Sequence, residues 1–195
     1  MNLRVRITFG FLIIVFVMAC VSGIIIWQES NMHKAFQNSS QISEIEKYFL
    51  ECRRQEKNFI IRHDFESVQL FTSNSDSLNI LVLKMLDHGI NEKMTENLNA
   101  LQENLDNYYL KFEEIISSGQ IEIDNTKVQS EVDLAREIHA LINEVKVLSN
   151  QEFNNAYAIT NNVNIFSILI GLFLSVLIAG FISTKIMEIL GNSSE

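Results

Sequence analysis

The sequence predicts an all-α membrane protein in which an up-down four-helix bundle lies between two transmembrane helices. Three features lead to this prediction: two long uncharged apolar runs, the absence of proline from all 195 residues, and a helical spacing of apolar residues between the runs. Proline breaks helices and glycine weakens them, so long stretches with neither residue are typical of helical structure.

The two apolar runs have the length of membrane spans. Residues 7–27 read ITFGFLIIVFVMACVSGIIIW and residues 165–183 read IFSILIGLFLSVLIAGFIS, both without a charged side chain. As a helix each would be ~30 Å long, which is the thickness of the hydrocarbon core of a bilayer. Val17 to Cys20 also resembles a lipoprotein box, but the chain stays apolar for seven residues beyond it. Lipidation of Cys20 is therefore the alternative to an uncleaved membrane helix.

Positive charges at the ends of the two runs predict their orientation. Arg4 and Arg6 precede the first run, and Lys185 follows the second. Cytoplasmic flanks of membrane helices are enriched in Lys and Arg. We therefore expect residues 1–6 and 184–195 in the cytoplasm, and residues 28–164 outside it.

The predicted external segment is acidic. Residues 28–163 hold 12 Lys and Arg against 22 Asp and Glu, a net charge of −10. Nucleic acid and anionic lipid surfaces are therefore poor partners. The four histidines lack metal-ligand spacing, and no catalytic arrangement or phosphate-binding glycine loop can be assembled. We expect neither an enzyme nor a metal or cofactor site.

The external segment divides into four predicted helices, at roughly 28–62, 65–87, 91–117 and 126–163. Its two glycines, Gly89 and Gly119, mark two turns, and Asp64 is placed to cap a new helix after a third break. An even number of bundle-length helices is also needed to bring the chain back to the membrane from which it started.

One seam of residues at alternating spacings of three and four is predicted to be buried in each helix, as in bundle packing. Two seam positions are polar, Glu56 in the first helix and Ser75 in the second. The predicted seams are Ile42, Ile45, Phe49, Cys52, Glu56 and Phe59; Phe65, Val68, Phe71, Ser75, Leu78, Val82 and Met85; Met94, Leu98, Leu101, Leu105, Tyr108, Phe112 and Ile115; and Leu134, Ile138, Leu141, Val145 and Leu148.

The polar seam residues are expected to meet in one layer of the bundle. Counting from the helix ends places Glu56, Ser75, Tyr108 and the small Ala135 within ~6 Å of one another along the axis. Arg136 follows Ala135 directly and lies close to this layer.

Helical angles separate the cations beside Glu56. Taking Glu56 as the centre of the inward face, Arg53 lies ~60° away, Lys57 ~100° away and Arg54 ~160° away. Arg53 therefore turns toward the layer, Lys57 lies at its border, and Arg54 points outward.

Two interpretations of this layer stay open. In one, the layer is a polar pocket that fixes a carboxylate or another polar ligand. In the other, it is a buried polar layer that sets the register of the bundle, and Arg136 pairs with Asp133 or Glu137 on the surface. The candidate ligand-binding residues are Arg53, Glu56, Lys57, Ser75, Tyr108 and Arg136.

The run RRQEKNFIIR (Arg53–Arg62), followed by Asp64, resembles part of the first helix of helical bimodular sensor domains. These domains belong to bacterial methyl-accepting chemotaxis proteins and some sensor histidine kinases. The resemblance implies an extracytoplasmic receptor in the bacterial inner membrane that binds small metabolites, often organic acids, and acts as a homodimer. It also implies a ligand contact for Arg53.

The chain departs from this family in two ways. The external segment has about half the length of a bimodular domain, so a single four-helix bundle is expected. Only residues 184–195 follow the second span, and Glu188 stands where the family's HAMP connector often has proline. We expect the input part of a chemotaxis-type receptor that detects an organic acid or amino acid and moves a helix across the membrane, truncated before its signalling module. The alternative is a ligand-free, membrane-anchored helical scaffold or assembly partner.

Overall fold

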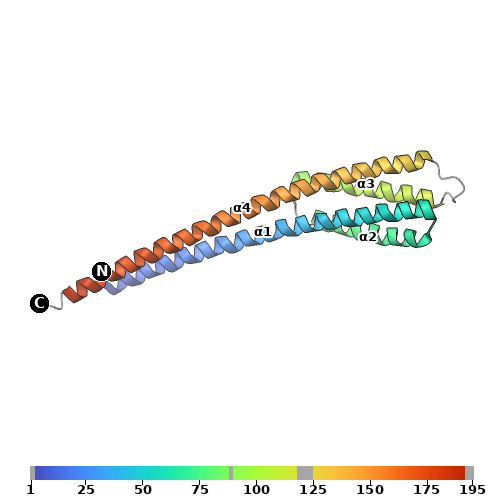
Figure 1. Ribbon diagram of the computed structural model, residues 1–195. Coiled ribbons are helices and arrows are strands. Elements are labelled where there is room, and N and C mark those ends of the chain that lie inside the picture. Colours follow the sequence, from blue (N-terminus) through green and yellow to red (C-terminus); the bar gives the residue numbers. More distant parts are fainter. Residues whose placement is uncertain (1–2, 88–89, 118–124, 192–195) are drawn as a thin grey trace. The chain divides into compact units, whose positions relative to one another are not determined.

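The computed structural model describes residues 3–87, 90–117 and 125–191, and these are helical apart from short connections. The helices are α1 (Leu3–Arg62), α2 (Phe65–Asp87), α3 (Glu92–Ser117) and α4 (Asn125–Gly191) (Figure 1). Because the described residues contain no strand, the predicted all-α class is confirmed. The turns predicted at Gly89 and Gly119 fall outside the described residues.

The connection between α1 and α2 lies where the sequence predicted a break. The amide of His63 donates to the carbonyl of Phe59 (2.8 Å), and His63 adopts a φ of 51°, the left-handed conformation that ends many helices. Asp64 then caps α2: its Oδ1 accepts from the amide of Glu66 (3.0 Å) and its Oδ2 from the hydroxyl of Ser67 (3.2 Å). These bonds satisfy groups that the helix ends would otherwise leave unpaired.

The chain divides into two compact units. The core unit comprises residues 34–153 and includes all of α2 and α3. The apolar unit comprises residues 1–33 and 154–195, and its described residues belong to α1 and α4.

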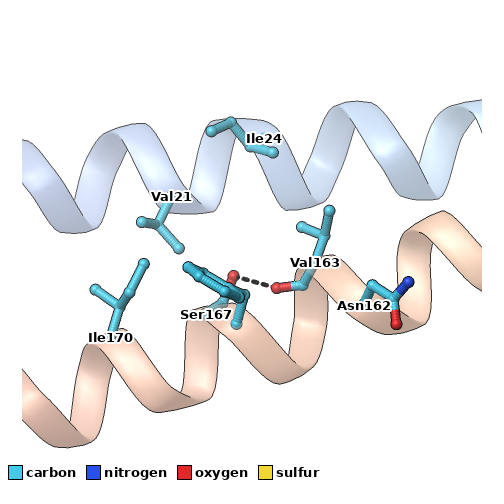
Figure 2. Close-up of a pocket in the computed structure, with 7 residues that line it drawn as sticks. Val21, Ile24, Asn162, Val163, Ser167 and Ile170 are labelled. Carbon is cyan, nitrogen blue, oxygen red and sulfur yellow. Dashed lines mark hydrogen bonds between the residues drawn. The ribbon is translucent and has the colours of Figure 1, made fainter.

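The apolar unit contains the two hydrophobic segments. Both α1 and α4 are long and apolar enough to cross a membrane, and their most apolar windows contain no buried residue. Figure 2 shows both helices here, where Val21 and Ile24 of α1 and Val163 and Ile170 of α4 line a groove of about 320 Å³. The hydroxyl of Ser167 donates to the carbonyl of Val163 (2.7 Å), so this polar group is satisfied within its own helix, as a hydrocarbon environment requires.

Neighbouring helices of the core unit run antiparallel. In each pair of helices, a contact nearer the C-terminal end of one helix lies nearer the N-terminal end of the other. The contacts are Cys52–Phe71 and Phe59–Phe65 between α1 and α2; Phe71–Phe112 and Asn79–Gln102 between α2 and α3; Asn97–Glu144 and Lys111–Ser130 between α3 and α4; and Ser39–Asn150 and Glu46–Lys146 between α1 and α4.

All four helices contribute to one hydrophobic core inside this unit. Every predicted seam residue of α1 and α3 is buried, and so are the predicted residues of α2 from Phe71 onward. Phe65 was placed in the seam wrongly, because it is 66 % exposed at the first position of α2. Ser67 takes the buried position in that first turn instead.

The predicted seam of α4 is partly wrong in its rotational phase. Ile138 and Val145 are buried, but Leu134, Leu141 and Leu148 are only half-buried at the edge of the core. The apolar stripe of α4 is wider than one seam, and packing decides which edge of it faces the centre. The buried positions of α4 within the core unit, among the described residues, are Glu131, Ala135, Ile138, Ile142, Val145 and Ser149.

Candidate functional site

A charged cluster lies inside the core unit, formed by Arg53 and Glu56 of α1 and Tyr108 of α3. Glu56 is 1 % exposed, and its Oε2 accepts hydrogen bonds from Arg53 Nη1 and from the Tyr108 hydroxyl. Arg53 and Glu56 are three residues apart in one helix, so their side chains reach each other over a single turn. The Arg53 guanidinium also lies 5.9 Å from the centre of the Tyr108 ring. The predicted meeting of these three residues is confirmed.

The environment of the cluster changes the protonation behaviour of all three groups. Burial raises the pKa of Glu56 above its usual range, while the positive charge of Arg53 and the Tyr108 hydrogen bond oppose this rise. Burial lowers the pKa of Arg53, but the charge of Glu56 and the contacts with Tyr108 outweigh it and leave that pKa raised. Burial, with Glu56 nearby, raises the pKa of Tyr108 far enough to keep its hydroxyl a donor.

Aromatic side chains enclose the Tyr108 end of the cluster. The rings of Phe49 and Phe71 lie 5.9 Å and 5.7 Å from the Tyr108 ring, centre to centre, and Phe71 lies 4.1 Å from Phe112. Tilted and edge-on ring pairs at these distances are favourable packing contacts. They also bury Glu56 and Tyr108, so the Glu56 end of the ion pair is held by a few strong, directed bonds.

Ser75 and Ala135 lie in the same core but contribute differently. Ser75 is 8 % exposed, and its hydroxyl donates to the carbonyl of Thr72 in its own helix (2.8 Å). The hydroxyl proton of Ser75 is therefore used within α2, and the predicted role of Ser75 in the polar layer stays a prediction. Ala135 is 5 % exposed, and its small side chain lines the open groove described next.

A groove of about 460 Å³ runs between α1 and α4 on the surface of the core unit. Arg53 links it to the buried cluster, because the Arg53 side chain lines the groove, is 15 % exposed and bonds Glu56 beneath. The groove is lined by Phe49, Leu50, Arg53, Lys57, Val132, Ala135, Arg136, His139, Ala140 and Asn143.

Three of the six candidate site residues, Arg53, Lys57 and Arg136, line this groove, and Arg53 also belongs to the buried cluster. Lys57 is exposed, and Arg136 is 71 % exposed and pairs with Asp133 at 2.8 Å. The surface pairing considered for Arg136 is therefore confirmed. Arg54 points away as predicted, since its side chain is 64 % exposed and pairs with Glu51 at 2.6 Å.

One buried acidic residue was missed by the sequence analysis. Glu131 of α4 is fully buried, and neither of its carboxyl oxygens has a hydrogen-bond partner among the described residues. Burial, with a smaller contribution from the charge of Glu56, raises the pKa of Glu131 to about 8, against the opposing charges of Arg53 and Lys111. Extending the seam backward from Ile138 by three and then four residues reaches Glu131, so a correct phase for α4 would have found it.

The site offers anion-binding groups but no cluster for a metal. Nowhere in the described part of the chain do three His, Cys, Asp or Glu side chains gather where they could hold a metal ion. No protein-family model, curated protein or solved structure matches the chain. What the site does must therefore be inferred from its own geometry.

Proposed function

We propose that this chain is the input part of a bacterial transmembrane receptor. In this proposal the core unit is a four-helix-bundle sensor domain outside the inner membrane, the apolar segments of α1 and α4 are the two spans, and both termini are cytoplasmic. The ligand is a small carboxylate such as an organic acid or an amino acid, and the receptor is a homodimer. The observation that carries the proposal is the groove between α1 and α4, which is lined by three cationic side chains and, among the described residues, by no carboxylate.

The chemistry of the groove suits a small anion. Arg53, Lys57 and Arg136 bring three positive charges to one opening, although residues 28–163 have a net charge of −10. Cationic walls attract anions and repel cations by long-range electrostatics. The volume of about 460 Å³ falls within the ~300–1,000 Å³ common for small-molecule sites.

Arg53 is the residue most able to connect ligand binding with the core. A guanidinium carries five N–H donors, so Arg53 can hold Glu56 with one edge and a ligand carboxylate with the other. Arg136 is available for exchange because its exposed pairing with Asp133 contributes little to stability.

The two walls of the groove supply a mechanism for signalling. Arg53 and Lys57 belong to α1, whereas Arg136 and His139 belong to α4. A ligand that bridges both walls favours one packing of α4 against α1, and a shift of ~1–2 Å is typical of helix displacements in two-state receptors. Because α4 also contains one of the predicted spans, this shift would pass into the membrane.

A scaffold without a ligand is the second candidate function. The observation that favours it is the completeness of the buried cluster, in which Glu56 already accepts from both Arg53 and Tyr108. A satisfied buried ion pair of this kind can have a purely structural role, which is to fix the register of neighbouring helices.

A ligand screen on the full chain in lipid nanodiscs separates the two functions. Di- and tricarboxylic acids and amino acids are tested for an increase in unfolding temperature; a ligand at 100 times its Kd stabilises by ~2.7 kcal/mol. A hit should weaken far more in Arg53→Ala and in Lys57→Ala than in the matched control Arg54→Ala, whose side chain points away from the groove. Stabilisation by no member of the panel would favour the scaffold, and equal weakening of a hit in all three variants would refute the groove as its binding site.

A further inference from the structure

Glu131 combines full burial with the absence of a hydrogen-bond partner among the described residues. Both of its carboxyl oxygens are inaccessible to water, and no described residue donates to them. An ionised carboxylate in such a place would lose its hydration with nothing to replace it, and neutralisation avoids this desolvation penalty. Glu56 shows the contrast, because it is equally buried but has two donors on one oxygen.

The charges that face Glu131 come from two neighbouring helices. From α1, Glu56 repels a second negative charge and Arg53 attracts it; from α3, Lys111 attracts it. No described titratable group of α2 or of α4 itself contributes to the perturbation. Arg53 is already bonded to Glu56, and Lys111 donates to the carbonyl of Ser130 (3.5 Å), so neither cation is bonded to Glu131.

A proton is the ligand that this arrangement accepts. Glu131 does not line the groove between α1 and α4, and its oxygens are closed off by packed side chains. A proton needs no volume, and it removes the charge that the core cannot solvate. Binding a proton therefore removes the desolvation cost of a carboxylate that has no hydrogen-bond donor among the described residues.

We propose that Glu131 is a proton-binding site through which pH controls the packing of α4 against α1 and α3. With its proton in place, Glu131 behaves as an uncharged member of the α4 seam, next to Ala135. Without it, a second negative charge lies near Glu56 inside the core, and α4 loosens at this level. This inference does not depend on the groove binding any ligand.

The direction of the pH effect follows from the raised pKa. Glu131 holds its proton up to about pH 8 when folded, against 4.5 for an ordinary glutamate. Between these values the folded state binds one proton more at Glu131 than the open state, so the stability that Glu131 contributes is greatest below pH 4.5 and falls as the pH rises toward 8. One linked proton changes the opening equilibrium by up to ~10-fold per pH unit in this window.

Hydrogen exchange of the full chain in lipid nanodiscs tests the proposal. Exchange of the segment 128–142 is measured between pH 5.5 and pH 9 and corrected for intrinsic exchange rates. We expect protection in wild type to fall by up to ~10-fold per pH unit as the pH rises to about 8. Glu131→Gln, which stays neutral, should remove this pH dependence, whereas Glu137→Gln, at an exposed position of the same helix, should keep it.

A direct titration keeps the test decisive if Glu131→Gln fails to fold. The glutamate carboxyl carbons are labelled with carbon-13 in the wild-type chain, and the Glu131 signal is assigned by its loss in Glu131→Met. A midpoint well above that of exposed glutamates supports the proposal. A midpoint in the ordinary range, or a Glu131→Gln variant that keeps the pH dependence of wild type, would overturn it.

Discussion

Replacing Arg53 with methionine should destabilise the core unit strongly. Methionine keeps a long unbranched side chain but removes the guanidinium that faces Glu56, which is 1 % exposed. Glu56 then holds a buried carboxyl with the Tyr108 hydroxyl as its remaining described donor. Removing one partner of a buried pair in this way costs ~3–5 kcal/mol, and we expect the free energy of unfolding to fall by that amount.

The adjacent arginine provides a matched control. Arg54 also forms an ion pair three residues away, with Glu51, but the two side chains are 64 % and 34 % exposed. Exposed pairs of this kind contribute ~0–1 kcal/mol, so Arg54→Met should have little effect. Both pairs join an arginine and a glutamate three residues apart, in opposite order along the helix, so the difference between the two variants reports mainly on burial.

A triple variant separates the loss of charge from the loss of packing. Combining Arg53→Met, Glu56→Leu and Tyr108→Phe removes all the polar groups of the cluster together and leaves none of them unpaired. Such apolar replacements of buried ion pairs are often neutral or stabilising by ~1–4 kcal/mol. The triple variant should therefore recover most of the stability that Arg53→Met alone loses.

Urea denaturation of the full chain in a mild detergent, followed by circular dichroism, measures these free energies. The three variants and wild type are compared at one pH and one detergent concentration, with a shared slope against urea. Equal small effects of Arg53→Met and Arg54→Met would refute the reasoning. So would a triple variant as unstable as Arg53→Met, because the cost would then come from shape rather than from an unpaired charge.

Two further predictions concern the ends and the interior of the first two helices. Cys52 is buried with its Sγ 3.9 Å from the carbonyl of Phe71, and burial raises the pKa of its thiol to about 12. At neutral pH Cys52 should therefore react with maleimide only after unfolding. A cysteine that replaces exposed Ser43 should react at once, and mass spectrometry measures both reactions. Fast labelling of Cys52 in the folded chain would contradict its burial. Asp64→Ala removes the cap of α2 and should lower the free energy of unfolding by ~0.5–2 kcal/mol in urea denaturation, and an Asp64→Asn variant, which can still accept, should lose less. Equal losses in the two variants would mean that the cap does not act through its hydrogen bonds.

The candidate site was predictable where it depends on one helix and its nearest turn. Arg53 and Glu56 could be paired from their spacing, and the outward direction of Arg54 followed from its angle. Ser75 could be placed in the core but not given a bonding partner. Its hydroxyl had a carbonyl of its own helix within reach, and such local bonds compete with partners on other helices.

By itself the sequence determined the all-α class, the break before Asp64, the buried seams of α1 and α3, and two segments apolar enough to cross a membrane. These features are local or periodic, so short stretches of chain contain all the information they need. Only the tertiary structure decided which edge of the wide apolar stripe of α4 faces the centre, and with it the burial of Glu131. That choice depends on how four helices fill a common core, and no single helix determines it.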